Sequence, residues 1–116
     1  MPIPRRLYIE QVLDLYRRAP GTTGHLRRSD RLLAGELHDR RIPLPLICDA
    51  FILAVARRTL RSTDAPPLAT IGSLYYFKPV IDELIAQPPD PGYLPYIRHR
   101  LAAVAPHFVA AAHRLP

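Results

Sequence analysis

Fourteen prolines in a chain of 116 residues set the strongest limit on the structure that this sequence can form. A proline has no backbone N–H group, so helix interiors and central strands both exclude it. Between the prolines and glycines, apolar residues recur at steps of three and four, and no segment alternates β-branched with polar residues. The sequence therefore predicts an all-α protein, a compact bundle of five to six helices.

One domain accounts for residues 1–116, because a chain of this length buries a core without disulfides or a metal ion. Its charge is unevenly distributed. Residues 1–61 hold twelve basic side chains against six acidic ones, whereas residues 62–116 hold four of each. The net charge of +6 therefore lies in a basic half, 1–61, and the half 62–116 is neutral. Such an excess favours an anionic partner.

Two helices are expected before residue 42. Apolar residues follow Pro4 at helical spacing, and Pro20 ends the pattern. Ser29 is the expected N-cap of a second helix, which runs to Arg41.

The third helix is expected to begin at the prolines after Arg41 and to end near Arg61. Its apolar residues cover nearly the whole circumference, which is typical of a helix surrounded by others. The turn before it gives the outline of a helix-turn-helix, whose second helix reads bases with polar side chains near its start. Here that start carries Pro43, Leu44, Pro45, Cys48 and Asp49. We therefore expect a central, buried third helix that does not read DNA sequence.

Two helical patterns fill the neutral half. Five apolar residues keep one register across Pro79, which predicts one kinked helix or two short collinear ones: Leu74, Phe77, Ile81, Leu84 and Ile85. The last pattern is a narrow apolar seam over residues 94–115, bent at Pro106 and formed by Leu94, Ile97, Leu101, Val104, Phe108, Ala111 and Leu115. Such a seam packs against one neighbour, either in its own domain or in a protein partner or second copy of the chain.

Arginine supplies fifteen of the sixteen basic residues, mostly in pairs. Pairs at helix C-termini complement the helix dipole, and a GC-rich genome would also favour arginine. The dipole does not explain Arg27, Arg28 and Arg31, which flank a predicted helix N-terminus. Guanidinium groups bind phosphate through two hydrogen bonds, and aromatic rings stack on unpaired bases. The predicted nucleic-acid-binding residues are Arg5, Arg6, Arg27, Arg28, Arg31, Arg57, Arg58, Arg61, Tyr75 and Lys78.

Patterns of catalysis and metal binding are missing from the sequence. The five histidines lack the spacing and the partner cysteines of a metal site, and there is no nucleophile elbow. We expect a protein that is not an enzyme and needs no cofactor or metal. The lone Cys48 indicates a reducing compartment, and no run reaches the roughly 18 apolar residues of a membrane span. The sequence therefore favours a cytoplasmic protein with no membrane partner.

Two patterns within residues 30–85 resemble the C-terminal domain of the DnaD family, bacterial and phage proteins that help to load the replicative helicase. The first, PLICDAFILAVAR, supplies Leu46, Ile47, Ala50 and Ala54. The second, YYFKPVIDEL, supplies Tyr76, Phe77, Val80 and Ile81. The resemblance implies non-specific DNA binding beside a protein partner.

Charge and resemblance together predict a non-catalytic, sequence-nonspecific nucleic-acid-binding accessory protein of a replication or mobile-element system. The alternative is a protein-interaction module, a helical adaptor or dimerisation domain, whose arginines serve helix ends and solubility. Retention on DNA or heparin across a salt gradient distinguishes the two.

Overall fold

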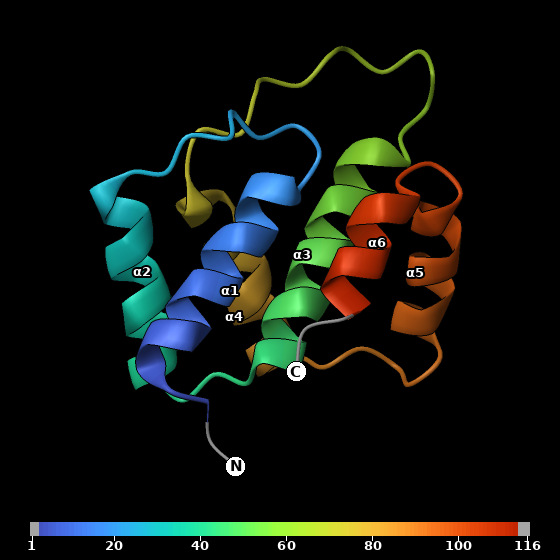
Figure 1. Ribbon diagram of the computed structural model, residues 1–116. Helices are drawn as coiled ribbons and strands as arrows, with labels where there is room; N and C mark the ends of the chain where they lie inside the picture. Colours follow the sequence, from blue (N-terminus) through green and yellow to red (C-terminus); the bar gives the residue numbers. More distant parts are fainter. Residues whose placement is uncertain (1–2, 114–116) are drawn as a thin grey trace.

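The computed structural model describes residues 3–113 (Figure 1). Within this range no strand forms, and the only strand-like pairing is a bridge between Thr22 and Ile71. The predicted all-α bundle is confirmed. Its elements are α1 (Arg5–Arg18), α2 (Arg28–Asp39), α3 (Leu44–Thr59), the 3-10 helix η1 (Leu74–Phe77), α4 (Lys78–Ala86), α5 (Tyr93–Ala102) and α6 (Pro106–His113).

Helix α3 lies at the centre and packs against α1, α4, α5, α6 and η1. In Figure 1, α2, α1, α3 and α6 lie side by side in front, with α4 and α5 behind them. Ten of the sixteen α3 residues are buried. One of them, Phe51, stacks on Phe77 with ring centroids 4.1 Å apart. The predicted central third helix is confirmed, and buried side chains from α1 to α6 join in one core.

Prolines occupy the first turns of the helices in the described part of the chain. Pro106 is the first residue of α6, Pro45 and Pro79 are the second residues of α3 and α4, and Pro95 is the third residue of α5. N–H groups in a first turn have no partner within the helix, so a proline there loses no hydrogen bond. The prolines thus fix where these helices begin without interrupting them.

Two predicted boundaries in the basic half are wrong. Helix α2 begins at Arg28, with Arg27 as its N-cap residue, so Ser29 lies inside the first turn. Instead of a serine N-cap, the helix start has the carboxylate of Asp30 in its first turn, which accepts a hydrogen bond from the N–H of the N-cap residue Arg27 at 2.9 Å. The helix also ends at Asp39 rather than Arg41, since Arg41 adopts a left-handed φ of 61°.

In the neutral half, η1 is followed directly by α4. Of the two predicted arrangements, the segment therefore forms two short helices rather than one kinked helix. Ile85 is 44% exposed and does not join the core as its register predicted. The seam forms two helices, α5 and α6, instead of one bent helix. A turn separates them, because Ala105 N–H donates to the Leu101 carbonyl before Pro106 starts the next helix.

The seam packs within its own domain. Ile97, Leu101 and Phe108 are buried in the common core, whereas Val104 is 59% exposed in the turn. Leu115 lies outside the described residues. The two helices therefore fold back on each other against α3, and α6 also reaches α1.

Asp30 is the one charged residue that is fully buried among the described residues. Its Oδ1 accepts from the Leu74 N–H at 2.9 Å and from the Ser73 hydroxyl at 3.2 Å, while Oδ2 accepts from the Arg27 N–H. A single carboxylate therefore holds the start of α2 and the start of η1 together, although they are more than forty residues apart.

Replacing Phe51 with alanine should lower the free energy of unfolding by about 3–5 kcal/mol, because it leaves a cavity beside Phe77. Urea denaturation followed by circular dichroism measures this loss. Leu32→Ala, at a side chain that is 61% exposed, is the control and should cost less than about 0.5 kcal/mol. Equal losses for the two variants would contradict the position of α3 at the centre.

Asp30→Asn should destabilise the protein by about 2 kcal/mol, since an amide nitrogen must then face a backbone N–H or one buried donor must lose its acceptor. Glu36→Gln is the matched control, because it makes the same change on the exposed face of α2. Urea midpoints that agree for Asp30→Asn and the wild type would show that the buried carboxylate is dispensable.

Candidate nucleic-acid interface

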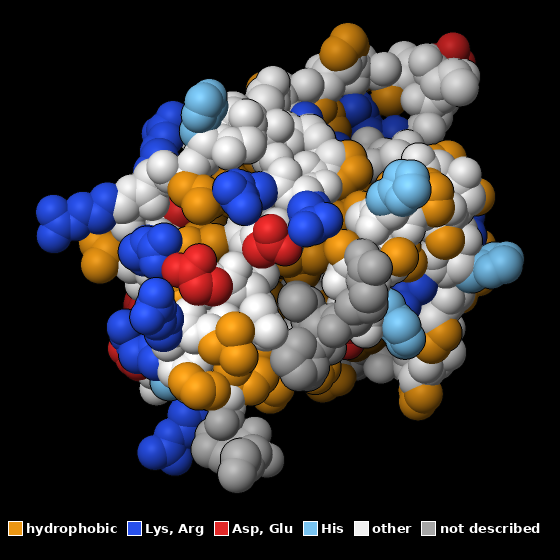
Figure 2. Space-filling view, in the orientation of Figure 1, with side chains coloured by type: hydrophobic (Ala, Val, Ile, Leu, Met, Phe, Trp, Pro, Cys, Tyr) orange, Lys and Arg blue, Asp and Glu red, His pale blue; other side chains and the backbone are white. Residues whose placement is uncertain are grey.

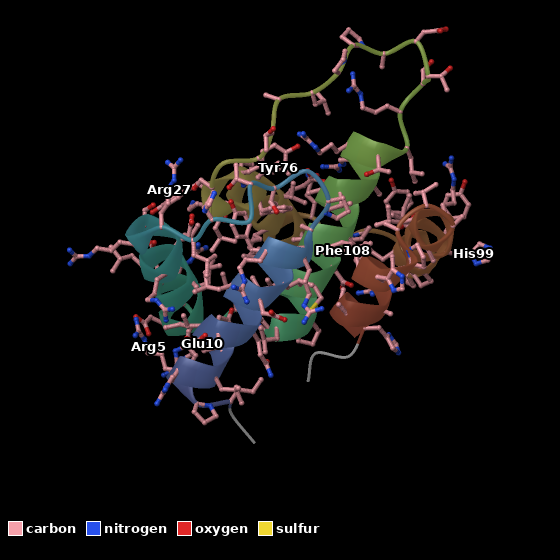
Figure 3. The ribbon with its side chains drawn as sticks, turned by 45° about the horizontal axis from the view of Figure 1, so that its top comes forward. Arg5, Glu10, Arg27, Tyr76, His99 and Phe108 are labelled. Atoms are coloured by element: carbon pink, nitrogen blue, oxygen red, sulfur yellow. The ribbon has the colours of Figure 1, made fainter. Side chains whose placement is uncertain are left out.

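The structure divides the ten predicted nucleic-acid-binding residues between two places. Helices α1 and α2, an antiparallel pair, carry Arg5, Arg6, Arg27, Arg28 and Arg31. The other five lie on or beside the end of α3 and the start of α4: Arg57, Arg58, Arg61, Tyr75 and Lys78. Even within the first group, Arg27 and Arg5 lie near opposite ends of α2 (Figure 3).

A furrow runs along the surface between α1 and α2. It consists of two hollows that share Arg31. The first is lined by Arg5, Arg6, Ile9, Arg31 and Leu32. The second is lined by Glu10, Gln11, Leu13, Asp14, Arg17, Leu26 and Arg31. We call the two together the α1–α2 furrow. In Figure 2, basic side chains surround a few acidic ones over these helices.

Besides Arg17, which pairs with Asp14 on the same helix, two furrow arginines form ion pairs with surface carboxylates. Arg31 Nη1 lies 3.0 Å from Glu10 Oε1, and Arg5 donates to both Asp39 oxygens at 3.0 and 3.2 Å. Hydrogen bonds from Arg5 and His38 lower the pKa of Asp39 below its ordinary value. The four side chains of these two pairs are about half exposed, and ion pairs on the surface contribute little to the free energy of folding. A phosphate group is therefore able to compete for these guanidinium groups.

Gly35 makes room for the Arg5 side chain. A Cβ atom at this position would collide with the Arg5 guanidinium, which lies over the middle of α2 on its way to Asp39. Glycine inside a helix costs about 1 kcal/mol relative to alanine. At this position the missing side chain lets a cation of α1 rest directly on the backbone of α2.

Four arginines of residues 3–41 have no ion-pair partner within residues 3–113: Arg6, Arg27, Arg28 and Arg41. All four are exposed. Arg27 is the N-cap residue of α2 and Arg28 its first residue, so the prediction that they flank a helix N-terminus is confirmed. Positive charge is unfavourable there unless an anion is present. The buried Asp30 carboxylate supplies one negative charge, and the arginine side chains remain open to solvent.

Most side chains of the second group bind other groups of the same chain. Arg57 holds Glu83 through two hydrogen bonds at 2.9 and 2.6 Å, which lower the pKa of Glu83, and Lys78 lies 3.0 Å from Asp82. Tyr75 is 46% exposed.

The remaining two arginines of this group bind backbone carbonyls. Arg58 donates to the Ala69 carbonyl and lies over the Tyr76 ring, 5.9 Å from its centroid. Arg61 donates to the Pro66 carbonyl at 2.9 Å. Sequence reasoning missed these roles, because no local pattern shows which carbonyls a loop will present.

Charge separates the part of the chain that forms α1 and α2 from the rest of the fold. Residues 3–41 carry nine arginines against five acidic residues, a net charge of +4, and one of the five acids is the buried Asp30. Residues 42–113 carry six basic residues against five acidic ones, a net charge of +1. The positive surface of the molecule is therefore that of α1 and α2.

Helix α3 offers no surface for reading bases. Leu44 and Ile47 are buried at its start, and Asp49 is held by Arg98 at 2.7 Å. Within residues 3–113, no three histidine, cysteine or acidic side chains come close enough to hold a metal ion. Nor does any helix in that range have the length and apolar character of a membrane span.

No protein-family model, curated protein or solved structure matches this chain. The resemblance to the DnaD C-terminal domain therefore stays a prediction.

Cys48 should be almost unreactive in the folded protein. It is 3% exposed, and burial raises the pKa of its thiol to about 11, so only about one thiol in a thousand is ionised at pH 8. We expect labelling with Ellman's reagent at pH 8 to be at least about 100-fold slower in buffer than in denaturant. Fast labelling of the native protein would mean that α3 is more open than the structure shows.

Proposed function

We propose that this protein is a non-catalytic, sequence-nonspecific nucleic-acid-binding accessory protein that contacts the phosphate backbone through helices α1 and α2. The observation that supports the proposal most directly is a set of exposed arginines within residues 3–41, which carry a net charge of +4. Four of them have no ion-pair partner in the described residues: Arg6, Arg27, Arg28 and Arg41.

Phosphate contact suits the chemistry of this surface. A guanidinium group forms two parallel hydrogen bonds to a phosphate, and binding releases condensed counterions from the nucleic acid. Arg5 and Arg31 add two guanidinium groups along the α1–α2 furrow for which a phosphate can compete, because their ion pairs with Asp39 and Glu10 are exposed. A strand laid along the furrow would place successive phosphates near guanidinium groups from both helices.

The proposed contacts carry no base information. Backbone contacts position a protein on nucleic acid, whereas sequence is read by side chains that enter a groove. The helix in the place of a recognition helix, α3, is buried. The DnaD resemblance supports a role in replication or in a mobile element, in the cytoplasm, with a protein partner nearby.

A protein-interaction module is the second candidate, and exposed apolar side chains favour it. Leu26 and Leu32 line the α1–α2 furrow while 39% and 61% exposed. A separate apolar hollow of about 420 Å³ lies between the start of α3, the end of α4 and the start of α5. These features suit an amphipathic peptide with acidic residues better than they suit a sugar-phosphate chain.

The salt dependence of binding tests the first candidate. Fluorescence anisotropy with duplex and single-stranded oligonucleotides should give affinity that falls steeply with salt. Each phosphate neutralised contributes about 0.9 to the log–log slope on duplex DNA. Replacing Arg27, Arg28 and Arg31 together with glutamine should lower this slope by roughly two to three units, with little change in preference among sequences.

Arg57→Gln with Lys78→Gln and Arg100→Gln is the matched control, since it removes the same charge from another part of the surface. It should lower the slope by clearly less. Equal effects of the two triple variants would mean that net charge alone drives binding. No binding of the wild type to DNA or RNA at about 50 mM salt would reject the proposal in favour of the interaction module.

A further inference from the structure

A hollow of about 500 Å³ lies beneath the long connection between α3 and η1. The turn after α1 closes one side and residues 62–68 close the other. Figure 2 shows basic side chains inside this hollow, under the loop at the top of the molecule. Its lining, which we call the loop hollow, consists of Pro20, Gly21, Arg58, Thr59, Arg61, Ser62, Thr63, Ala65, Pro66, Pro67 and Leu68.

Two guanidinium groups are fixed in the loop hollow. Arg58 is held by the Ala69 carbonyl and the Tyr76 ring, and Arg61 by the Pro66 carbonyl. Gly21 permits this packing: its φ is +92°, and a Cβ there would lie 2.7 Å from Arg58 Nε. A guanidinium carries five N–H donors, and the described structure uses one hydrogen bond from each arginine. The two cations are oriented in advance and keep donors for a ligand.

Hydroxyl groups complete the lining. Thr59, Ser62 and Thr63 line the hollow beside the two arginines. The Ser62 oxygen accepts a hydrogen bond from the Asp64 N–H at 3.3 Å, which leaves the hydroxyl proton free to donate. Guanidinium and hydroxyl donors around one small space suit a ligand that consists mainly of acceptor oxygens.

The charged side chains that line the loop hollow are all positive. None of its described lining residues is acidic. Asp64, on the same loop, is exposed and outside the lining, and the nearby Glu83 is held by Arg57. The C-terminal carbonyls of α3 bring partial negative charge close to this place, which the two guanidinium groups outweigh. An anion in the hollow therefore meets two cations and no carboxylate.

We propose that the loop hollow binds a phosphate monoester group through Arg58, Arg61 and the hydroxyl groups beside them. A phosphate monoester offers three acceptor oxygens and up to two negative charges, which match two guanidinium forks and short hydroxyl donors. The volume also suits a group of nucleotide size. Such a group comes either from a free nucleotide or from the 5′ end of a nucleic-acid strand. This site is separate from the α1–α2 furrow and does not depend on the proposed function.

Nuclear magnetic resonance of the full chain tests the proposal with inorganic phosphate as the probe. Titration at constant ionic strength should shift the backbone amide signals of residues 59–63, with smaller effects elsewhere. Shifts spread evenly over the arginines of α1 and α2 would overturn the proposal, because they indicate general attraction of anions.

Arg61→Gln should weaken phosphate binding by about tenfold, whereas Arg100→Gln, which removes the same charge from α5, should not weaken it. Ser62→Ala is the second variant and should give a smaller loss without disturbing either arginine. Thermal unfolding shows whether each variant is folded. If folded Arg61→Gln and Ser62→Ala both bind phosphate like the wild type, the proposal fails.

Two further ligands identify the source of the phosphate. Preference for a 5′-phosphorylated oligonucleotide over its 5′-hydroxyl form, lost in Arg61→Gln, indicates a strand end. Tight binding of adenosine monophosphate without that preference indicates a free nucleotide. Arg61→Gln should leave the salt slope for duplex DNA nearly unchanged. The triple variant of Arg27, Arg28 and Arg31 should still bind phosphate. Failure of one proposal can therefore be told apart from failure of the other.

Discussion

The packing of the α1–α2 pair against the rest of the fold depends on the hydrogen bonds of the buried Asp30 carboxylate. This carboxylate caps the first turn of α2 and accepts hydrogen bonds from Ser73 and Leu74, so the pair of helices α1 and α2 is tied to the segment that leads into α4. A buried carboxylate without partners is very costly, so this contact tolerates few alternative positions of η1. The same contact sets where Arg27 and Arg28 stand, because they flank the turn that it caps.

Much of the fold follows from the sequence because its signals are local. Prolines mark helix starts, and the apolar circumference of residues 44–56 identifies the central helix. The failures have physical causes in tertiary structure. Ser29 is the better N-cap by residue type, but the helix starts earlier, at a place where the Asp30 carboxylate bonds both the N–H of the N-cap residue Arg27 and η1. The seam at 94–115 has one helical register on both sides of Pro106, and periodicity alone does not show whether a proline bends a helix or ends it.

The candidate site was less predictable than the fold. Charge along the sequence indicated a basic first half, yet only the packing shows which arginines are already occupied. Arg57 meets Glu83 from another helix, and Arg58 and Arg61 meet carbonyls of a loop with no regular structure. Arg6, Arg27 and Arg28 differ from them in lacking such partners within the described residues, a difference that residue type does not encode.

The bridge between Thr22 and Ile71 ties the two long connections of the chain to each other. Ile71 donates its N–H to the Gly21 carbonyl at 2.7 Å, its own carbonyl accepts from Thr23, and its side chain is buried. Arg58 fastens the same two segments from the end of α3. The connections therefore belong to the cooperative folding unit, and its limits do not coincide with the ends of the helices. Extra residues inserted before Pro66, ahead of the carbonyls that hold Arg61 and Arg58, would leave this unit intact, whereas a cut between Ser73 and the bridge would divide it.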